Sequence, residues 1–138
     1  MYYTYMLRCE DNSIYTGITT DLKRRMDEHF TQVNNCAKYT STHKAKKLEA
    51  AWQSENRVLA SKLEFNIKRL KKQEKETIIK NNYKMQELLE NKIDGKEYKS
   101  VNLGEHSIEV GKRSLWKLLL SYNINNTLYN YICHFVII

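Results

Sequence analysis

The 138-residue chain contains no proline, only four glycines and three cysteines. Without proline, its longer helices have no internal breaker. Three of the four glycines lie in residues 94–112, and we expect that segment to be a linker or an extended stretch. The cysteines, Cys9, Cys36 and Cys133, form no CxxC pair and leave one thiol unpaired in any scheme, which argues against a disulfide framework. Cys36 and His43 do not supply the four ligands of a structural zinc site.

Long apolar runs are also missing. The N-terminus has no apolar signal core, so we expect a cytoplasmic protein with free thiols. The C-terminal tail is apolar and aromatic, but Lys117 and residues 121–127 interrupt it, and a membrane span needs about 18 to 20 continuous apolar residues. We therefore expect no membrane association. The final "YICHFVII" has a strand-like composition; the alternatives for it are an added strand, a homodimer or protein-partner contact, and a poorly evolved extension.

The net charge of +7 is concentrated in the middle of the chain. Residues 31–100 hold sixteen Lys and Arg against nine Asp and Glu, whereas residues 1–30 hold four against five. The excess begins at "KYTSTHKAKK", residues 38–47. A basic stretch is more often a solvated face than a nucleic-acid site, so the charge favours a polyanionic partner only if another feature agrees.

Tyrosine, threonine and isoleucine dominate residues 2–9 and 14–19, and the intervening "EDNS" is typical of a turn. This pattern predicts a β-hairpin. A helix is expected over 21–33, capped by Thr20 or Asp21. Its apolar residues recur at helical spacing and predict a buried stripe of Leu22, Met26, Phe30 and Val33.

Beyond this helix we expect a basic, irregular stretch and then a third strand at 47–52. Further helices are predicted over 57–70, capped by Ser54 or Asn56, and over 71–82. The order is β-β-α-β-α-α, which indicates an α+β fold: a small three-stranded antiparallel sheet flanked by helices. We expect one domain over 1–82 and a C-terminal extension over 83–138.

The two tyrosine triplets carry a more specific signal. Tyr3-Thr4-Tyr5, followed ten residues on by Tyr15-Thr16-Gly17 and then by "TTDLKRRMDEH", resembles the two-part signature of the GIY-YIG nuclease superfamily. The resemblance is closest to the small standalone bacterial members and covers about residues 2–82. Tyr3 replaces the usual glycine of the first triplet, and Thr16 replaces the isoleucine of the second. Both signature tyrosines and the structural glycine, Gly17, are retained.

The resemblance implies a set of catalytic residues. Arg25 falls at the family's arginine position, His29 at the histidine of some members, and Glu64 in "KLEFNIKRLKK" at the metal-binding acid. One divalent ion, Mg²⁺ or Mn²⁺, would then bind at Glu64, since Mg²⁺ takes few carboxylates and keeps several waters. Arg25 would bind the scissile phosphate. Tyr5 would be the base or the group that orients the water, Tyr15 a second positioning group, and His29 an alternative base or proton shuttle.

Taken singly, these residues have simpler interpretations. The tyrosines would be cross-strand packing residues, His29 a core histidine within the apolar stripe, and Glu64 a surface ion-pair partner. The pairing of the two strands offers a test. In an antiparallel hairpin the numbers of two directly paired residues always add up to the same value. Tyr5 and Tyr15 face the same side of the sheet only if this value is even. A three-residue turn at Asp11–Ser13 would give a sum of 24, whereas a two- or four-residue turn would separate the tyrosines unless a bulge intervenes.

The same resemblance indicates a nucleic-acid-binding role for the basic segment 38–47. Its residues Lys38-Tyr39-Thr40 match a basic-aromatic motif of the small members. We expect DNA to be the partner, without resolving single-stranded, duplex or branched forms. The expected contacts are Arg24, Lys38, Tyr39, His43, Lys44, Lys46 and Lys47. The resulting hypothesis is a metal-dependent DNA endonuclease with a role in repair or recombination. The alternative is a non-catalytic nucleic-acid-binding or adaptor module that keeps the fold.

Overall fold

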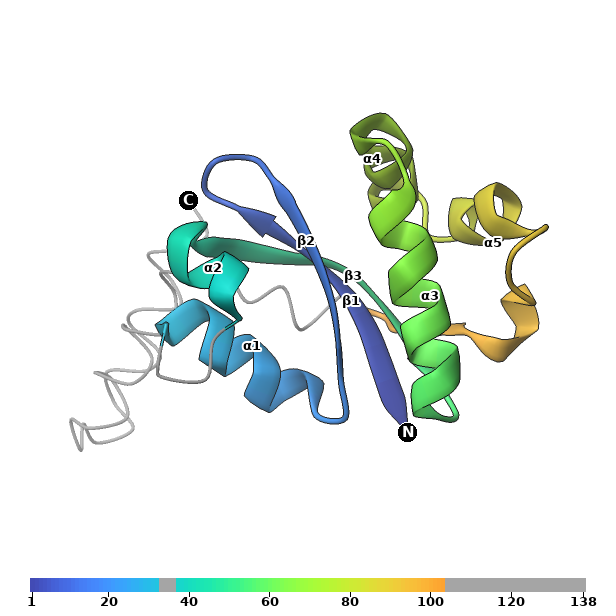
Figure 1. Ribbon diagram of the computed structural model, residues 1–138, viewed down its shortest axis with the longest axis horizontal. Helices are drawn as coiled ribbons and strands as arrows, with labels where there is room; N and C mark the ends of the chain where they lie inside the picture. The colour runs from blue at the N-terminus through green and yellow to red at the C-terminus, as the bar shows by residue number, and fades with distance from the viewer. Residues whose placement is uncertain (33–36, 104–138) are drawn as a thin grey trace, which may run out of the picture.

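A computed structural model describes residues 1–32 and 37–103. The predictions made for Val33, Cys36, Cys133 and the C-terminal tail lie outside these residues. The described elements are β1 (Tyr2–Cys9), β2 (Ile14–Thr19), α1 (Leu22–Thr31), α2 (Lys38–Thr42), β3 (Ala45–Ser54), α3 (Arg57–Arg69), α4 (Lys72–Lys80), α5 (Lys84–Leu89), a 3₁₀ turn (Gly95–Glu97) and β4 (Lys99–Ser100). Figure 1 shows them in chain order.

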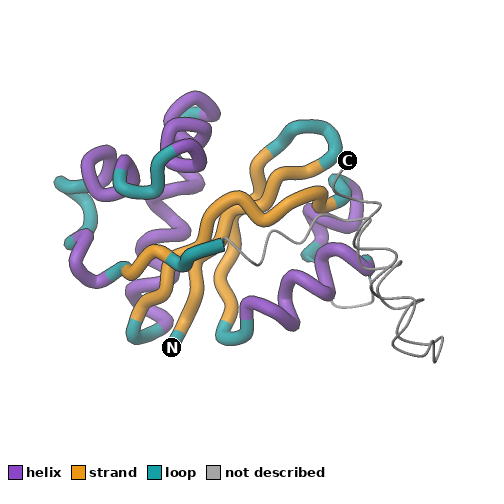
Figure 2. Tube along the Cα trace, turned by 180° about the vertical axis from the view of Figure 1, so that it is seen from behind, coloured by secondary structure: helices purple, strands orange, loops and turns teal. Residues whose placement is uncertain are grey.

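The strands form one antiparallel sheet in the order β2-β1-β3-β4. α1 and α2 lie on one side of this sheet and α3, α4 and α5 on the other (Figures 1 and 2). The predicted α+β class is confirmed, but the sheet has four strands rather than three. β4 has only two residues, Lys99 and Ser100, which pair with Gln53 and Trp52. Such a short strand carries no alternating pattern from which it can be predicted.

The hairpin has the predicted strands and a turn shifted by one residue. Tyr5 pairs with Gly17, so the register sum is 22 rather than the 24 that a turn at Asp11–Ser13 would give. The Cys9 N–H donates to the Ser13 carbonyl at 2.9 Å and the Asn12 N–H to the Cys9 carbonyl at 3.0 Å, which makes a three-residue turn. Asn12 has φ 63°, in the left-handed region that asparagine tolerates well. The sum remains even, so both signature tyrosines face the same side of the sheet.

Helix starts follow the predicted caps. The Asp21 carboxylate accepts from the backbone of α1, and the Asn56 side chain accepts from that of α3. The segment before β3, expected to be irregular, instead contains α2, and β3 begins at Ala45, two residues before the predicted strand. A five-residue helix is too short to show helical periodicity in sequence.

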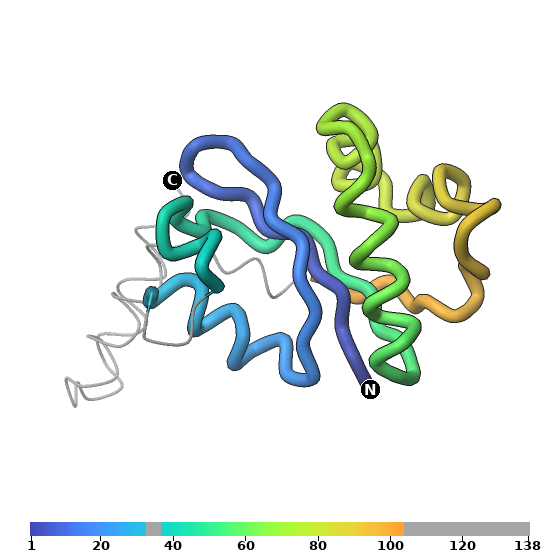
Figure 3. The backbone as a smooth tube through the Cα atoms, viewed as in Figure 1, coloured from blue at the N-terminus to red at the C-terminus, as the bar shows by residue number. Residues whose placement is uncertain are grey.

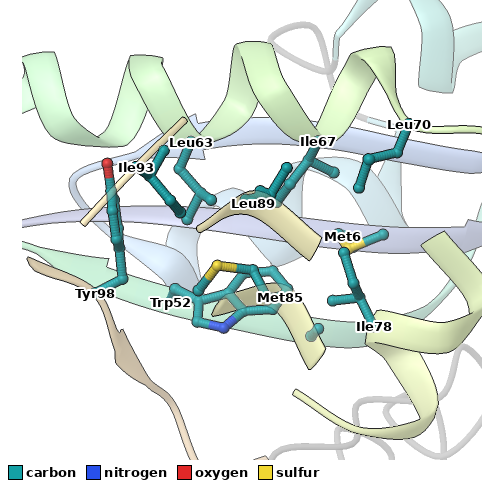
Figure 4. Packing of buried hydrophobic residues seen from close by; sticks show 11 residues of the cluster. Met6, Trp52, Leu63, Ile67, Leu70, Ile78, Met85, Leu89, Ile93 and Tyr98 are labelled. Carbon is teal, nitrogen blue, oxygen red and sulfur yellow. The ribbon is translucent and has the colours of Figure 1, made fainter. Parts of the chain in front are cut away.

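The core beyond the sheet's α3 face is built around Trp52 (Figure 4). Its buried neighbours come from β1, α3, α4, α5 and the segment after α5: Met6, Leu63, Ile67, Ile78, Met85, Leu89, Ile93 and Tyr98. Residues 85–98 therefore pack against the same sheet as the first 82 residues, and the boundary at 82 stays a prediction. No helix within the described residues is long and apolar enough to cross a membrane.

Arg8 connects three parts of the fold. Its guanidinium donates to Glu76 of α4 at 2.5 and 2.6 Å, to Glu49 of β3 at 3.1 Å and to Asn12 of the hairpin turn at 3.0 Å. The Arg8 side chain is only 13% exposed. Charge-assisted, two-pronged pairs of this kind are strong when water is partly excluded.

Replacing Arg8 with methionine is expected to lower the free energy of unfolding by about 2 kcal/mol, because two partly buried carboxylates lose their shared cation. Urea unfolding measures this change. Arg24→Met is the matched control, since Arg24 is 56% exposed and pairs with Glu28 on the helix surface; it should cost less than about 1 kcal/mol. Equal losses in the two variants would contradict the structural role of Arg8.

Candidate active site

Four of the sequence-predicted residues meet on the α1 face of the sheet. Tyr5 comes from β1, Tyr15 from β2, and Arg25 and His29 from α1. The Tyr5 hydroxyl lies 2.7 Å from His29 Nε2, and Arg25 Nε donates to the same hydroxyl at 3.2 Å. The Tyr15 ring lies 6.2 Å from that of Tyr5 and 5.3 Å from that of His29. The hairpin register and the i, i+4 spacing on α1 together assemble this tyrosine cluster.

Gly17 makes room for the two phenols. A Cβ at this position would lie 2.7 Å from the Tyr5 hydroxyl oxygen and 3.0 Å from the Tyr15 ring. Any side chain would therefore push the phenols apart. This contact gives the structural role predicted for Gly17 a direct physical basis.

Thr40 of α2 determines which nitrogen of His29 carries the proton. The Thr40 hydroxyl donates to the Ala37 carbonyl at 3.1 Å and lies 2.8 Å from His29 Nδ1. With the single hydroxyl proton assigned to the Ala37 carbonyl, the Thr40 oxygen accepts from His29 Nδ1–H. Nε2 is then the unprotonated nitrogen, and the Tyr5 O–H donates to it. The sequence had included Thr40 in the 38–40 motif without giving it a role.

Electrostatics agree with this assignment. Burial, with a contribution from the Arg25 charge, lowers the pKa of His29 to about 4, so its ring is neutral at physiological pH. Burial also raises the pKa of the Tyr5 phenol above its ordinary value; the neighbouring Tyr15 adds to this, while Arg25 opposes it. In the free protein, Tyr5 is therefore a protonated donor and His29 a neutral acceptor.

Replacing Thr40 with valine should leave the buried His29 Nδ1–H without an acceptor, at a cost of about 1 to 3 kcal/mol. The Nε2–H tautomer should then become populated, with Tyr5 as its acceptor. Imidazole ¹⁵N chemical shifts distinguish the two tautomers, and Thr40→Ser, which keeps the hydroxyl, should retain the wild-type pattern. An unchanged Nδ1–H tautomer in the valine variant would show that Thr40 does not determine it.

The lowered pKa of His29 also predicts how stability depends on pH. Between pH 6.5 and about 4 the unfolded chain binds a proton on this histidine that the folded chain does not. The free energy of unfolding should therefore fall as pH is lowered through this window, by on the order of 2 kcal/mol. Chemical denaturation at a series of pH values measures this. His29→Gln should flatten the dependence; an unchanged dependence in this variant would refute the assignment.

An aromatic stack extends the tyrosine cluster toward the hairpin tip. Tyr39 of α2 lies 5.7 Å from Tyr15 and 4.2 Å from His43, with nearly parallel rings in both pairs. His43 Nδ1 contacts the Asp11 carboxylate at 2.6 Å. The α2 segment lies beside the hairpin tip (Figure 3). Two predicted DNA contacts, Tyr39 and His43, are thereby continuous with the cluster.

The remaining predicted contacts are spread more widely. Lys38, Lys44 and Lys46 are exposed. Lys47 pairs with Glu49, and Arg24 pairs with Glu28. The pairing of β3 with β1 shifts register at this point, between the Arg8–Lys47 and Cys9–Ala45 pairs. DNA contact by these basic residues stays a prediction.

Glu64 lies outside the tyrosine cluster. It belongs to α3, which contacts β1 and β2 from the opposite layer, and its carboxylate pairs with Lys68 at 2.7 Å. Among residues 1–32 and 37–103, no three His, Cys, Asp or Glu side chains gather as a metal site. The partly exposed single carboxylate of Glu64 fits an ion such as Mg²⁺, which completes its shell with water and substrate phosphate oxygens.

Comparisons with known proteins identify the family of this chain. Residues 1–90 match the family model described as the GIY-YIG catalytic domain. The chain is 47% identical over 78 residues to a UPF0213 protein of Fusobacterium nucleatum, covering 56% of this chain and 76% of the relative. It is 40% identical over 78 residues to the UPF0213 protein YhbQ of Salmonella typhimurium, with the same coverage. The solution structure of a UPF0213 protein from Bacillus halodurans is 34% identical, covers 62% of this chain and 93% of that one, and has a TM-score of 0.39.

The chain therefore belongs to the GIY-YIG catalytic-domain family, which is generally a family of nucleases. Within it, the chain is similar to the UPF0213 proteins, including YhbQ, whose names state no activity.

Proposed function

We propose that this protein is an endonuclease that hydrolyses phosphodiester bonds in DNA with the help of one divalent ion, Mg²⁺ or Mn²⁺. The observation that carries the proposal is the buried contact of Tyr5 with both His29 and Arg25, within a GIY-YIG domain. Weak sequence preference, selectivity for DNA structure, a role in repair or recombination and a cytoplasmic location belong to the same proposal.

The chain's own residues would divide the chemistry as follows. Arg25 brings a permanent positive charge to the tyrosine cluster and suits a phosphate oxygen. The buried Tyr5 holds Arg25 and His29 in place, and the half-buried Tyr15 presents its phenol nearer to solvent. His29 Nε2 can take the Tyr5 proton if that phenol in turn receives a proton from water. A bound phosphate would favour this transfer, because its negative charge raises the pKa of the imidazole.

Glu64 would hold the divalent ion. Such an ion, when bound, neutralises charge on a phosphate oxygen and assists the leaving group.

A non-catalytic nucleic-acid-binding module is the second candidate. It is favoured by the complete burial of the Tyr5 side chain and by the pairing of Glu64 with Lys68. In that case the tyrosine cluster would be a structural core, and binding would rest on the surrounding lysines and aromatic rings.

Incubation with labelled single-stranded, duplex and branched DNA separates these functions. A metal-dependent nuclease should cut at least one substrate in Mg²⁺ or Mn²⁺ and none in EDTA. Binding to the same substrates without cutting in either metal would support the binding module instead.

A further inference from the structure

A groove of about 240 Å³ lies between the hairpin tip and α4. None of the residues of α4 was expected to contact DNA from the sequence. The groove is lined by Asp11, Ser13, Ile14, Tyr39, Lys72 and Lys75.

The two walls are fixed relative to each other by Arg8. Its guanidinium donates to Asn12 in the hairpin turn at 3.0 Å and to Glu76 of α4, next to Lys75, at 2.5 and 2.6 Å. A site held by such contacts needs little reorganisation to bind a ligand, which reduces the cost of binding.

One wall leads to the tyrosine cluster. Tyr39 is 40% exposed in the groove, and its ring stacks on Tyr15. Tyr15 in turn lies against Tyr5 and His29. A strand lying in the groove therefore has a continuous aromatic surface toward the predicted catalytic phenols.

The other wall leads to Glu64. Lys75 Nζ donates to the Lys68 carbonyl at 3.3 Å, and Lys68 Nζ contacts the Glu64 carboxylate at 2.7 Å. The tyrosine cluster and Glu64 lie on opposite sides of the sheet. The ring contacts that begin at Tyr39 connect the groove to the first, and the contacts that begin at Lys75 connect it to the second.

The charges in the groove suit a phosphodiester. Lys72 and Lys75 supply two ammonium groups from one helix. Burial, with a further contribution from the charge of Lys68, lowers the pKa of Lys75. The opposing carboxylate, Asp11, is already engaged by Ser13 and His43 on its two oxygens. Its negative charge is therefore partly compensated.

We propose that this groove binds the phosphodiester backbone of the DNA strand beside the scissile phosphate, with Lys72 and Lys75 as phosphate contacts. The identity of the polyanion as DNA rests on the proposed function. The groove would guide one strand past the β2 edge, between the tyrosine cluster and Glu64.

The test is equilibrium binding of fluorescent DNA in EDTA over a range of salt concentrations. The Lys72→Gln/Lys75→Gln variant should show a salt slope smaller than that of wild type by about 1.4 to 1.8, since each phosphate contact contributes about 0.7 to 0.9. Between about 50 and 200 mM salt, wild type should thus lose about tenfold more affinity than the variant.

Two control variants make the result specific. Lys92→Gln/Lys96→Gln removes the same charge from a different hollow, lined also by Glu87, Glu90 and Asp94, and should keep the wild-type slope. Lys72→Arg/Lys75→Arg keeps the charge and should also keep the slope. Equal slopes in wild type and in the Lys72→Gln/Lys75→Gln variant, or equal losses in the two glutamine variants, would overturn the proposal.

Binding in EDTA also separates this proposal from the nuclease proposal. A reduced slope in a protein that cuts no DNA would support the groove and contradict the endonuclease. Cutting by wild type with an unchanged slope in the Lys72→Gln/Lys75→Gln variant would support the endonuclease and overturn the groove. No measurable binding of DNA by wild type would overturn the groove as a DNA site.

Discussion

Replacing Tyr5 with phenylalanine is expected to lower the rate of DNA cleavage by about 10²- to 10³-fold, within the range for loss of a group that handles protons. The hydroxyl removed is the shared partner of His29 Nε2 and Arg25 Nε. Without it, neither side chain is held at the tyrosine cluster by this contact, and the buried imidazole nitrogen loses its donor. The measurement is single-turnover cleavage in excess enzyme, so that loss of binding does not enter the rate.

Tyr98→Phe is the matched control for this substitution. Tyr98 is also a buried tyrosine, and its hydroxyl donates to the Leu59 carbonyl at 3.0 Å, but it packs on the opposite face of the sheet. Tyr98→Phe loses this one hydrogen bond, whereas Tyr5→Phe loses those to His29 and Arg25. At about 1 kcal/mol for each bond, both variants should be destabilised, Tyr5→Phe by the larger amount. Only Tyr5→Phe should lose cleavage. Equal cleavage rates in the two variants would remove Tyr5 from the mechanism.

The elements predicted with correct or nearly correct bounds are those with a clear local sequence signal. The two hairpin strands are rich in tyrosine, threonine and isoleucine over 2–9 and 14–19, and both occur as predicted. α3 shows its apolar stripe over more than three turns and begins after the expected cap, Asn56. The turn between the strands was placed one residue late, because "EDNS" offers several turn-forming residues and only the backbone conformation of Asn12 selects among them.

The elements that were missed depend on contacts distant in sequence. α2 is held against the rest of the fold by the buried Thr40, whose partner His29 lies eleven residues earlier. β4 exists because Lys99 and Ser100 reach the free edge of β3. Neither contact leaves a local pattern that sequence periodicity detects.

The residues of the candidate site likewise differ in whether the sequence carries a local signal for them. Tyr5, Tyr15, Arg25 and His29 were predicted from ordered motifs, and the structure brings them together. Thr40 was not, because a threonine carries no charge or periodic signal that marks it as a histidine partner. The lysines of the proposed groove, Lys72 and Lys75, were also not predicted. They belong to a lysine-rich helix, where a lysine is normally a solvated surface residue.

Replacing Glu64 with glutamine is expected to reduce metal-dependent cleavage by about 10³-fold or more, because the amide removes the carboxylate charge that would hold the divalent ion. The fold should tolerate the change. Glutamine is as good a helix former as glutamate, and the ion pair with Lys68, whose side chain is 53% exposed, contributes less than about 1 kcal/mol. Cleavage is measured as a function of Mg²⁺ and of Mn²⁺ concentration, alongside binding to the same DNA in EDTA.

Glu87→Gln provides the comparison, since Glu87 also forms a surface pair, with Lys84 at 2.6 Å on α5. Both substitutions remove one negative charge from a helix surface and should change the salt dependence of DNA binding to a similar, small extent. Only Glu64→Gln should lose cleavage at every metal concentration, while its binding of DNA in EDTA persists. Wild-type cleavage by Glu64→Gln would place the metal-binding acid elsewhere, and a parallel loss in Glu87→Gln would show that overall charge, rather than a ligand, limits the reaction.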